Sequence, residues 1–291
     1  MSLQGKTLLL GIGAQKTGSS WLAQYFLSHP QVLASPMKAF HFFDLAFSPV
    51  PEERAHFRRR ALQNLAQEAT SLAKTGTLDN AQGEAFAKLR ALIDGARLLY
   101  ESSAYLDYYR REIQTERVFA DMSPAYQLLP PETFARMHHW HERVKFLFVM
   151  RDPVDRHLSQ CWYDARARGE TLRAQTVLAN LDDRTYFERS NYVKTLESLD
   201  EAGVPETDCL VLFFEKLFTE PTMRRVCAYL GVDYLPAACD TSHNATVRHK
   251  EFDQSVLQHC RDRFSFVYEY VYARYKSHVP TSWANAAHCC S

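Results

Sequence analysis

One short segment near the start of the chain restricts the possible folds more than any other. Residues 7–12 (TLLLGI) form a continuous apolar run that Gly13 follows, and a loop spans residues 13–18. Because this run does not alternate with polar residues, it predicts a strand buried on both faces of a parallel sheet. From Ser19, with Ser19 or Ser20 available near the N-cap, four apolar residues fall on one helical stripe: Trp21, Leu22, Tyr25 and Phe26. A strand, a glycine loop and a helix in this order can cradle a phosphate or sulfate at the helix N-terminus.

The same order of elements recurs along the chain. Apolar runs at residues 117–122, 144–150 and 209–214 predict further buried strands, and a shorter strand is expected at 31–35. Helical patterns follow these runs. Buried strands that alternate with helices predict the α/β class, here a three-layer α/β/α arrangement with a mainly parallel central sheet and a P-loop-like phosphate-binding loop.

Two segments depart from this alternation. Residues 38–44 (KAFHFFD) are expected to form an aromatic turn or the edge of a strand. The charge-rich stretch over residues 51–116 has apolar residues at helical spacing, which predicts two or three amphipathic helices outside the main sheet. We therefore expect a single domain over residues 1–291 with a helical insertion at about residues 46–116.

Charge and cysteine content exclude several classes of protein. The chain has 34 Lys and Arg residues against 34 Asp and Glu residues, so it lacks the basic excess typical of proteins that bind nucleic acids or anionic membranes. Its seven cysteines include no CxxC pair, which disfavours a zinc site or a disulfide framework. No apolar run approaches the roughly 20 residues that a membrane span needs. We expect a cytoplasmic protein with reduced thiols and with no nucleic-acid or membrane partner.

The loop and the start of its helix hold a dense set of candidate anion ligands. Backbone amides, one lysine and three hydroxyls come from six consecutive residues: Gln15, Lys16, Thr17, Gly18, Ser19 and Ser20. A nucleotide triphosphatase loop has its lysine directly after the second glycine, whereas Lys16 precedes Gly18. The glycines do not fit the GxGxxG fingerprint either. The loop is therefore expected to bind phosphate or sulfate, while a P-loop kinase is disfavoured by the lysine order and by the missing context for a Mg²⁺ ligand.

Two longer motifs are similar to those of a known enzyme family. QKTGSSWL, at residues 15–22, resembles the 5′-phosphosulfate loop of the sulfotransferases that depend on 3′-phosphoadenosine 5′-phosphosulfate (PAPS). FLFVMRDPVDRHLSQCW, at residues 146–162, resembles the 3′-phosphate motif of that family. The stretches HPQVLASPMKAFHFFD, ADMSPAY, RSNYVKTLESL and LVLFFEKL resemble further family segments in the same order. The resemblance covers residues from about 7 to 250 and is closest to the glycosaminoglycan-type and bacterial branches. The tail beyond it, with Cys289 and Cys290, resembles nothing known to us.

The resemblance implies a reaction and a set of roles. A sulfuryl group would pass from PAPS to a hydroxyl or amine of a small-molecule or carbohydrate acceptor, leaving 3′-phosphoadenosine 5′-phosphate (PAP), and no metal would be needed. Lys16 would stabilise the leaving group, while Arg151 and Ser159 would hold the 3′-phosphate. The predicted fold agrees, because Arg151 follows a buried strand at the edge where α/β sheets bind ligands.

Other residues have two possible roles each. Trp21 and Tyr192 are expected either to flank the adenine ring or to pack in the core. Arg248 and Lys250 would close over the 3′-phosphate or would simply be solvated. Four tyrosines are expected to line an acceptor cleft, to pack in the core or to form a homodimer interface: Tyr100, Tyr105, Tyr108 and Tyr109. The neighbouring histidines at 138, 139 and 141 are expected on the surface, because adjacent helical positions point apart.

The base that would take the proton of the acceptor is the one point where the resemblance breaks. Similar family members have a glutamate where this chain has Ala39. Three residues are candidates to replace it: His41, whose imidazole titrates near neutral pH, Asp121, and Lys38, which is the weakest while protonated. The alternative is a homologue that binds PAPS or PAP with weak or lost activity.

Overall fold

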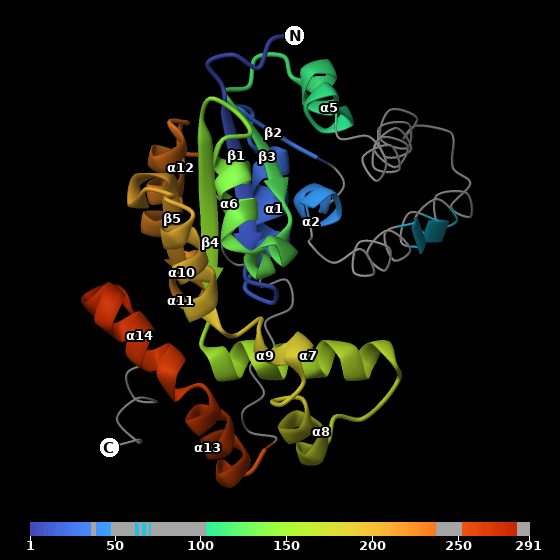
Figure 1. The fold of residues 1–291 in the computed structure, drawn as a ribbon, viewed down its shortest axis with the longest axis vertical. Helices are drawn as coiled ribbons and strands as arrows, with labels where there is room; N and C mark the ends of the chain where they lie inside the picture. Colours follow the sequence, from blue (N-terminus) through green and yellow to red (C-terminus); the bar gives the residue numbers. More distant parts are fainter. Residues whose placement is uncertain are drawn as a thin grey trace.

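A parallel sheet of five strands forms the centre of the molecule, as expected from the apolar runs (Figure 1). The computed structural model describes residues 1–35, 39–47, 62–63, 66–67, 70, 103–236 and 252–283. Its strands lie in the order β2-β3-β1-β4-β5, and each neighbouring pair is parallel. They span Thr7–Gly13 (β1), Val32–Ala34 (β2), Val118–Met122 (β3), Val144–Met150 (β4) and Cys209–Phe213 (β5). The predicted α/β class with a parallel sheet is confirmed.

Helices cover both faces of the sheet. On the face that contains Leu9 and Leu147, the apolar residues of α1 and α12 complete one core cluster. On the face that contains Leu10 and Phe146, α6 and α10 contribute to the other. Alternate residues of one strand therefore enter opposite cores, which is why the strands are apolar throughout.

The helix bounds are as follows. The α-helices span Ser19–Ser28 (α1), Phe42–Phe47 (α2), Ala104–Glu112 (α5), Pro131–His138 (α6), Pro153–Ala167 (α7), Ala174–Ala179 (α8), Arg184–Phe187 (α9), Tyr192–Glu201 (α10), Phe214–Leu217 (α11), Glu220–Leu230 (α12), Gln254–Arg263 (α13) and Ser265–Tyr275 (α14). Within the described residues, 3₁₀ helices span Pro124–Leu128 (η1), Glu206–Asp208 (η2) and Lys276–His278 (η4). Among the described helices, none is long and apolar enough to cross a membrane.

One local prediction was wrong. The aromatic segment at 38–44 was expected as a turn or strand edge, but helix α2 begins within it at Phe42. The hydroxyl of Tyr126, far away in the chain, accepts hydrogen bonds from the backbone amides of Phe42 (2.9 Å) and Phe43 (3.4 Å), which stabilises this helix start. Helix α1 is capped by Gly18 in a left-handed conformation (φ 87°) and not by the hydroxyl of a serine.

The carboxyl ends of the strands face helix α7, which lies across the lower edge of the sheet in Figure 1. Helices α8 and α13 lie beyond the same edge. Most of the predicted insertion at 46–116 lies outside the described residues, apart from its ends and five single positions. The loop after β1, the start of α7 and helix α2 therefore define the region where a ligand site was expected.

Candidate functional site

The loop between β1 and α1 is held in a tight turn at the carboxyl edge of the sheet. Two of its residues have left-handed backbones, Lys16 (φ 71°) and Gly18 (φ 87°). Thr17 is buried, and its hydroxyl donates a hydrogen bond to the carbonyl of Ala14 at 2.6 Å. The amide of Ala14 donates to the carbonyl of Val149 in β4 at 2.8 Å. The loop is thus fixed to the neighbouring strand, and a left-handed lysine is the type of backbone strain that is concentrated at ligand sites.

The amides at the start of α1 are available as donors. Within the described part of the chain, no backbone hydrogen bond engages the amides of Thr17, Gly18, Ser19 or Ser20. The side chain of Ser19 is half-buried and that of Ser20 is exposed, while Gln15 is half-buried beside them. Amides at a helix N-terminus lack partners within the helix and carry the positive end of its dipole. This loop can therefore bind an anion.

Arg151 joins the second predicted motif to this loop. It directly follows β4, and only 2% of its surface is exposed. Its Nη1 donates to the carbonyl of Lys16 at 3.3 Å, and its guanidinium lies over the ring of Phe214 at 4.6 Å. Two motifs that are separated by 135 positions in the chain thus meet at one point.

Helix α7 carries the remaining predicted ligand of this motif. The carboxylate of Asp155 lies 3.9 Å from Nη2 of Arg151. Ser159 and Tyr163 follow at intervals of four residues, so the three side chains share one helix face. Ser159 is buried to 7% exposure, whereas Tyr163 is 60% exposed and its ring lies 4.1 Å from Nζ of Lys16. The structure thus places Lys16, Arg151 and Ser159 around one region.

Two acidic side chains that the sequence analysis did not single out, Asp152 and Glu215, stabilise the segment that follows β4. Asp152 caps α7, since its Oδ1 accepts from the amides of Val154 and Asp155. Burial, followed by the charge of Asp155, raises the pKa of Asp152 to about 7. Burial likewise raises the pKa of Glu215, which accepts a hydrogen bond from the amide of Asp152 at 2.8 Å. Glu215 lies in the LVLFFEKL stretch that resembles a family segment, and this resemblance could have pointed to it. No comparable sequence signal pointed to residues of the C-terminal segment.

The two predicted adenine neighbours lie in the core. Tyr192 has no exposed surface, and its hydroxyl donates to the carbonyl of Arg151 at 2.8 Å. Trp21 is 7% exposed and stacks on Tyr25 with ring centres 5.9 Å apart, while Phe218 contacts it edge-on. Of the two roles expected for each ring, these contacts match packing. Because Tyr192 is completely buried, its ring has no exposed surface on which an adenine could stack, in contrast to the adenine contact that was expected as one of its two roles.

His41 lies at the start of α2 and is paired with a carboxylate. Its Nδ1 is 2.8 Å from Oδ2 of Asp44, and 33% of its side chain is exposed while Asp44 is buried. A carboxylate at this distance holds the proton on Nδ1, so the lone pair of the neutral ring is on Nε2. The pair has the form of an oriented general base.

Asp121, the second candidate base, is enclosed by hydroxyl groups. Its carboxylate accepts hydrogen bonds from Ser123 (2.5 Å), Tyr126 (2.8 Å) and Tyr105 (3.1 Å). Burial raises its pKa against the opposing effect of these hydrogen bonds. The hydroxyl of Ser123 also accepts the amide of His41 at 3.3 Å. The Asp121 network therefore fixes the backbone from which His41 extends.

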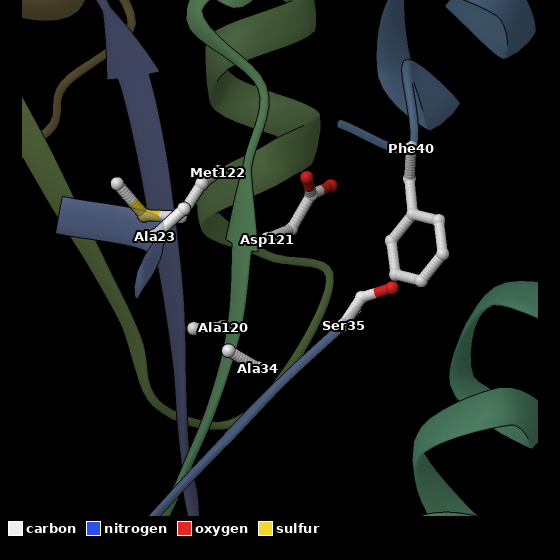
Figure 2. Close-up of a pocket in the computed structure, with 7 residues that line it drawn as sticks. All are labelled: Ala23, Ala34, Ser35, Phe40, Ala120, Asp121 and Met122. Carbon is white, nitrogen blue, oxygen red and sulfur yellow. The ribbon is translucent and has the colours of Figure 1, made fainter. Parts of the chain in front are cut away.

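A shallow pocket opens beside this network, between the ends of β2 and β3. Figure 2 shows the carboxylate of Asp121 and the hydroxyl of Ser35 on the side of the strands that faces Phe40. The pocket is lined by Ala23, Ala34, Ser35, Phe40, Ala120, Asp121 and Met122. It is small and is lined mostly by short side chains.

The remaining candidates lie in the core, on the surface or outside the described residues. Tyr105, Tyr108 and Tyr109 are buried against Phe40, which matches core packing. His138 pairs with Asp208 at 3.0 Å. In the described ranges, no group of three His, Cys, Asp or Glu residues could hold a metal ion. Lys38, Tyr100, Arg248, Lys250, Cys289 and Cys290 lie outside the described residues.

Comparisons with known proteins identify a family and a shared fold. A family model described as "Sulfotransferase family" matches residues 9–236. No curated protein sequence matches significantly. The crystal structure of a sulfotransferase from Alicyclobacillus acidocaldarius has a TM-score of 0.63 and 21% identity, and the alignment covers 95% of this chain and 98% of that one. A sulfotransferase domain from the curacin biosynthetic pathway has a TM-score of 0.50 and 14% identity, with 92% and 98% covered. At these identities, the two structures show a shared fold.

Proposed function

Because the chain belongs to the sulfotransferase family, we propose that it transfers a sulfuryl group from PAPS to a hydroxyl or amine of a carbohydrate or other small-molecule acceptor. The single observation that supports this best is the hydrogen bond between Arg151 and the carbonyl of Lys16 at 3.3 Å. It brings an amide-lined loop and a buried guanidinium together at one edge of the sheet. A nucleoside that carries phosphate groups at two positions matches such a pair of anion sites.

The residues present fit this donor. Among the described residues, the amides of 17–20 have no backbone hydrogen-bond partner; they lie at a helix N-terminus, where a 5′-phosphosulfate would bind. Arg151 and Ser159 would hold the 3′-phosphate, and Phe214 under the guanidinium keeps that arginine in place. We also propose that the chain is closest to the glycosaminoglycan-type and bacterial branches of the family and that the protein is cytoplasmic.

Catalysis requires charge to be neutralised on the leaving side and a proton to be removed on the acceptor side. Bound PAPS would supply an activated sulfuryl group at the end of the loop. Lys16 extends from that loop, so its ammonium would neutralise charge on the leaving oxygen. His41, oriented by Asp44, would take the proton of the acceptor on Nε2. In this proposal Asp121 is a positioning residue, because its oxygens already accept hydrogen bonds from three hydroxyl groups.

Ligand binding tests the donor directly. We expect PAP to raise the melting temperature of the protein, because a ligand at about 100 times its Kd stabilises the folded state by about 2.7 kcal/mol. ATP with Mg²⁺ should do much less. The reverse ranking would contradict the proposal. Stabilisation by PAP without transfer from labelled PAPS to any acceptor in a cell extract would support the alternative, a binding homologue that lost activity with Ala39.

A further inference from the structure

The C-terminal segment beyond the family match contacts two residues next to the proposed donor site, Asp152 and Glu215. Trp283 is fully buried, and its Nε1 donates a hydrogen bond to Oε1 of Glu215 at 3.0 Å. The same oxygen accepts the backbone amide of Asp152 at 2.8 Å. Trp283 thus holds the carboxylate that holds the residue next to Arg151. The family match ends at residue 236, more than forty positions earlier.

Tyr268 makes a second connection to the same segment. Its hydroxyl donates to Oδ2 of Asp152 at 2.9 Å, while Oδ1 of Asp152 accepts the amides of Val154 and Asp155. Both oxygens of the helix cap are therefore engaged, one by helix α7 and one by helix α14. A cap that is fixed on both sides cannot rotate without breaking a hydrogen bond of its buried carboxylate.

Ring packing connects the segment to Arg151 itself. The ring of Trp283 lies 6.4 Å from that of Tyr192 with an interplanar angle of 26°, and it contacts Tyr268 edge-on at 5.9 Å. The hydroxyl of Tyr192 donates to the carbonyl of Arg151 at 2.8 Å. Hydrogen bonds thus hold the backbone carbonyl of Arg151, the backbone amide of Asp152 and the side-chain carboxylate of Asp152.

From these contacts we propose that Tyr268 and Trp283 are positioning residues for Arg151 and thereby set recognition of the 3′-phosphate of the donor. This inference rests on the proposed function. Burial raises the pKa of Glu215, and the charge of Arg151 opposes this effect, so the two side chains interact electrostatically. The hydrogen bond from Trp283 keeps that carboxylate on the backbone of Asp152, and so prevents an ion pair with Arg151 that would compete with phosphate.

The test compares two ligands that differ only in the 3′-phosphate. Dissociation constants for PAP and for adenosine 5′-phosphate (AMP) are measured by calorimetry on the full chain and on the variants Tyr268→Phe and Trp283→Phe. Each variant should weaken PAP binding by about 5- to 30-fold, the range for a lost buried hydrogen bond, and leave AMP binding within about twofold. In single-turnover assays, the variants should need a higher PAPS concentration to reach half of the maximal rate, while the maximal rate itself should stay the same.

Tyr272→Phe is the matched control. Tyr272 lies one turn after Tyr268 on α14, and its hydroxyl makes no hydrogen bond among the described residues. It should change neither constant. Equal losses for PAP and AMP, or an unchanged preference for PAP, in both variants would overturn the inference while the proposed function stands. If the unmodified protein itself does not prefer PAP over AMP, the proposed function fails instead.

Discussion

His41 and Asp44 are three residues apart in the chain and form an acid–imidazole pair at the start of α2, in which the imidazole is half-buried and the carboxylate is buried. The geometry determines which nitrogen can act. Since Nδ1 is engaged with Asp44, proton transfer from an acceptor has to use Nε2. This pairing supports the proposed role of His41 as the base, because a packing histidine needs no oriented lone pair.

At the residue scale, we predict that His41→Ala lowers the rate of single-turnover sulfuryl transfer by about 10²- to 10⁴-fold, the usual contribution of a general base. Asp44→Asn should cause a smaller loss, because the ring remains but its tautomer is no longer fixed. His138→Ala is a suitable control, since His138 also pairs with a carboxylate, Asp208, at 3.0 Å but lies on α6. An unchanged rate in His41→Ala would remove His41 as the base.

At the scale of elements, the short helix α2 depends on a residue of η1. The phenol of Tyr126 accepts the amides of Phe42 and Phe43 and donates to Asp121, so it connects the helix N-terminus to β3. Six residues are too few for a helix to persist by its own hydrogen bonds. The placement of His41 therefore depends on this buried contact.

We predict that Tyr126→Phe reduces both the stability and the activity of the protein. The free energy of unfolding should fall by about 1–3 kcal/mol, because two amides and a carboxylate lose a buried partner. The matched control is Tyr109→Phe, whose hydroxyl is equally buried but donates to the carbonyl of Ala120 and does not touch α2. Urea unfolding should show similar losses for both variants, whereas transfer assays should show a rate loss for Tyr126→Phe alone. Equal activity of the two variants would count against this role of the network.

At the scale of the whole molecule, buried titratable groups make the global stability depend on pH. His157 on α7 is fully buried, and its Nε2 contacts the carbonyl of Val177 at 3.0 Å. Burial, together with the charge of Arg156, lowers the pKa of His157 to about 4. Below its ordinary value near 6.5, the unfolded chain thus takes up a proton that the folded chain does not.

We therefore predict that acid destabilises the protein through His157. As the pH falls from 6.5 to 4, the unfolding free energy should drop by about 3 kcal/mol relative to a His157→Gln variant, following about 1.4 kcal/mol per pKa unit. Asp152 has the opposite sign, since its raised pKa costs stability as the pH rises toward 7. Taking the difference between the parent and the variant removes this opposing effect. A difference that stays constant with pH would contradict the prediction.

Local sequence patterns were sufficient for the sheet and for most of the candidate anion site. The strands β1, β3, β4 and β5 lie within one residue of the apolar runs that predicted them, because a buried strand needs apolar side chains on both faces. The loop and Arg151 were found for a related reason. A residue that follows a central parallel strand always lies at the carboxyl edge of the sheet, whatever the rest of the chain does.

The amino-acid sequence by itself determined the α/β class, the loop over 13–18 and the two anion motifs, since each depends on neighbours within one strand or one helix turn. Only the tertiary structure decided that α2 is a helix, that Tyr192 supports Arg151 from the core, and that Tyr268 and Trp283 hold Asp152 and Glu215. These features rest on hydrogen bonds between residues 41 to 116 positions apart. Such bonds form only where packing brings both groups out of water together, and no local pattern records that.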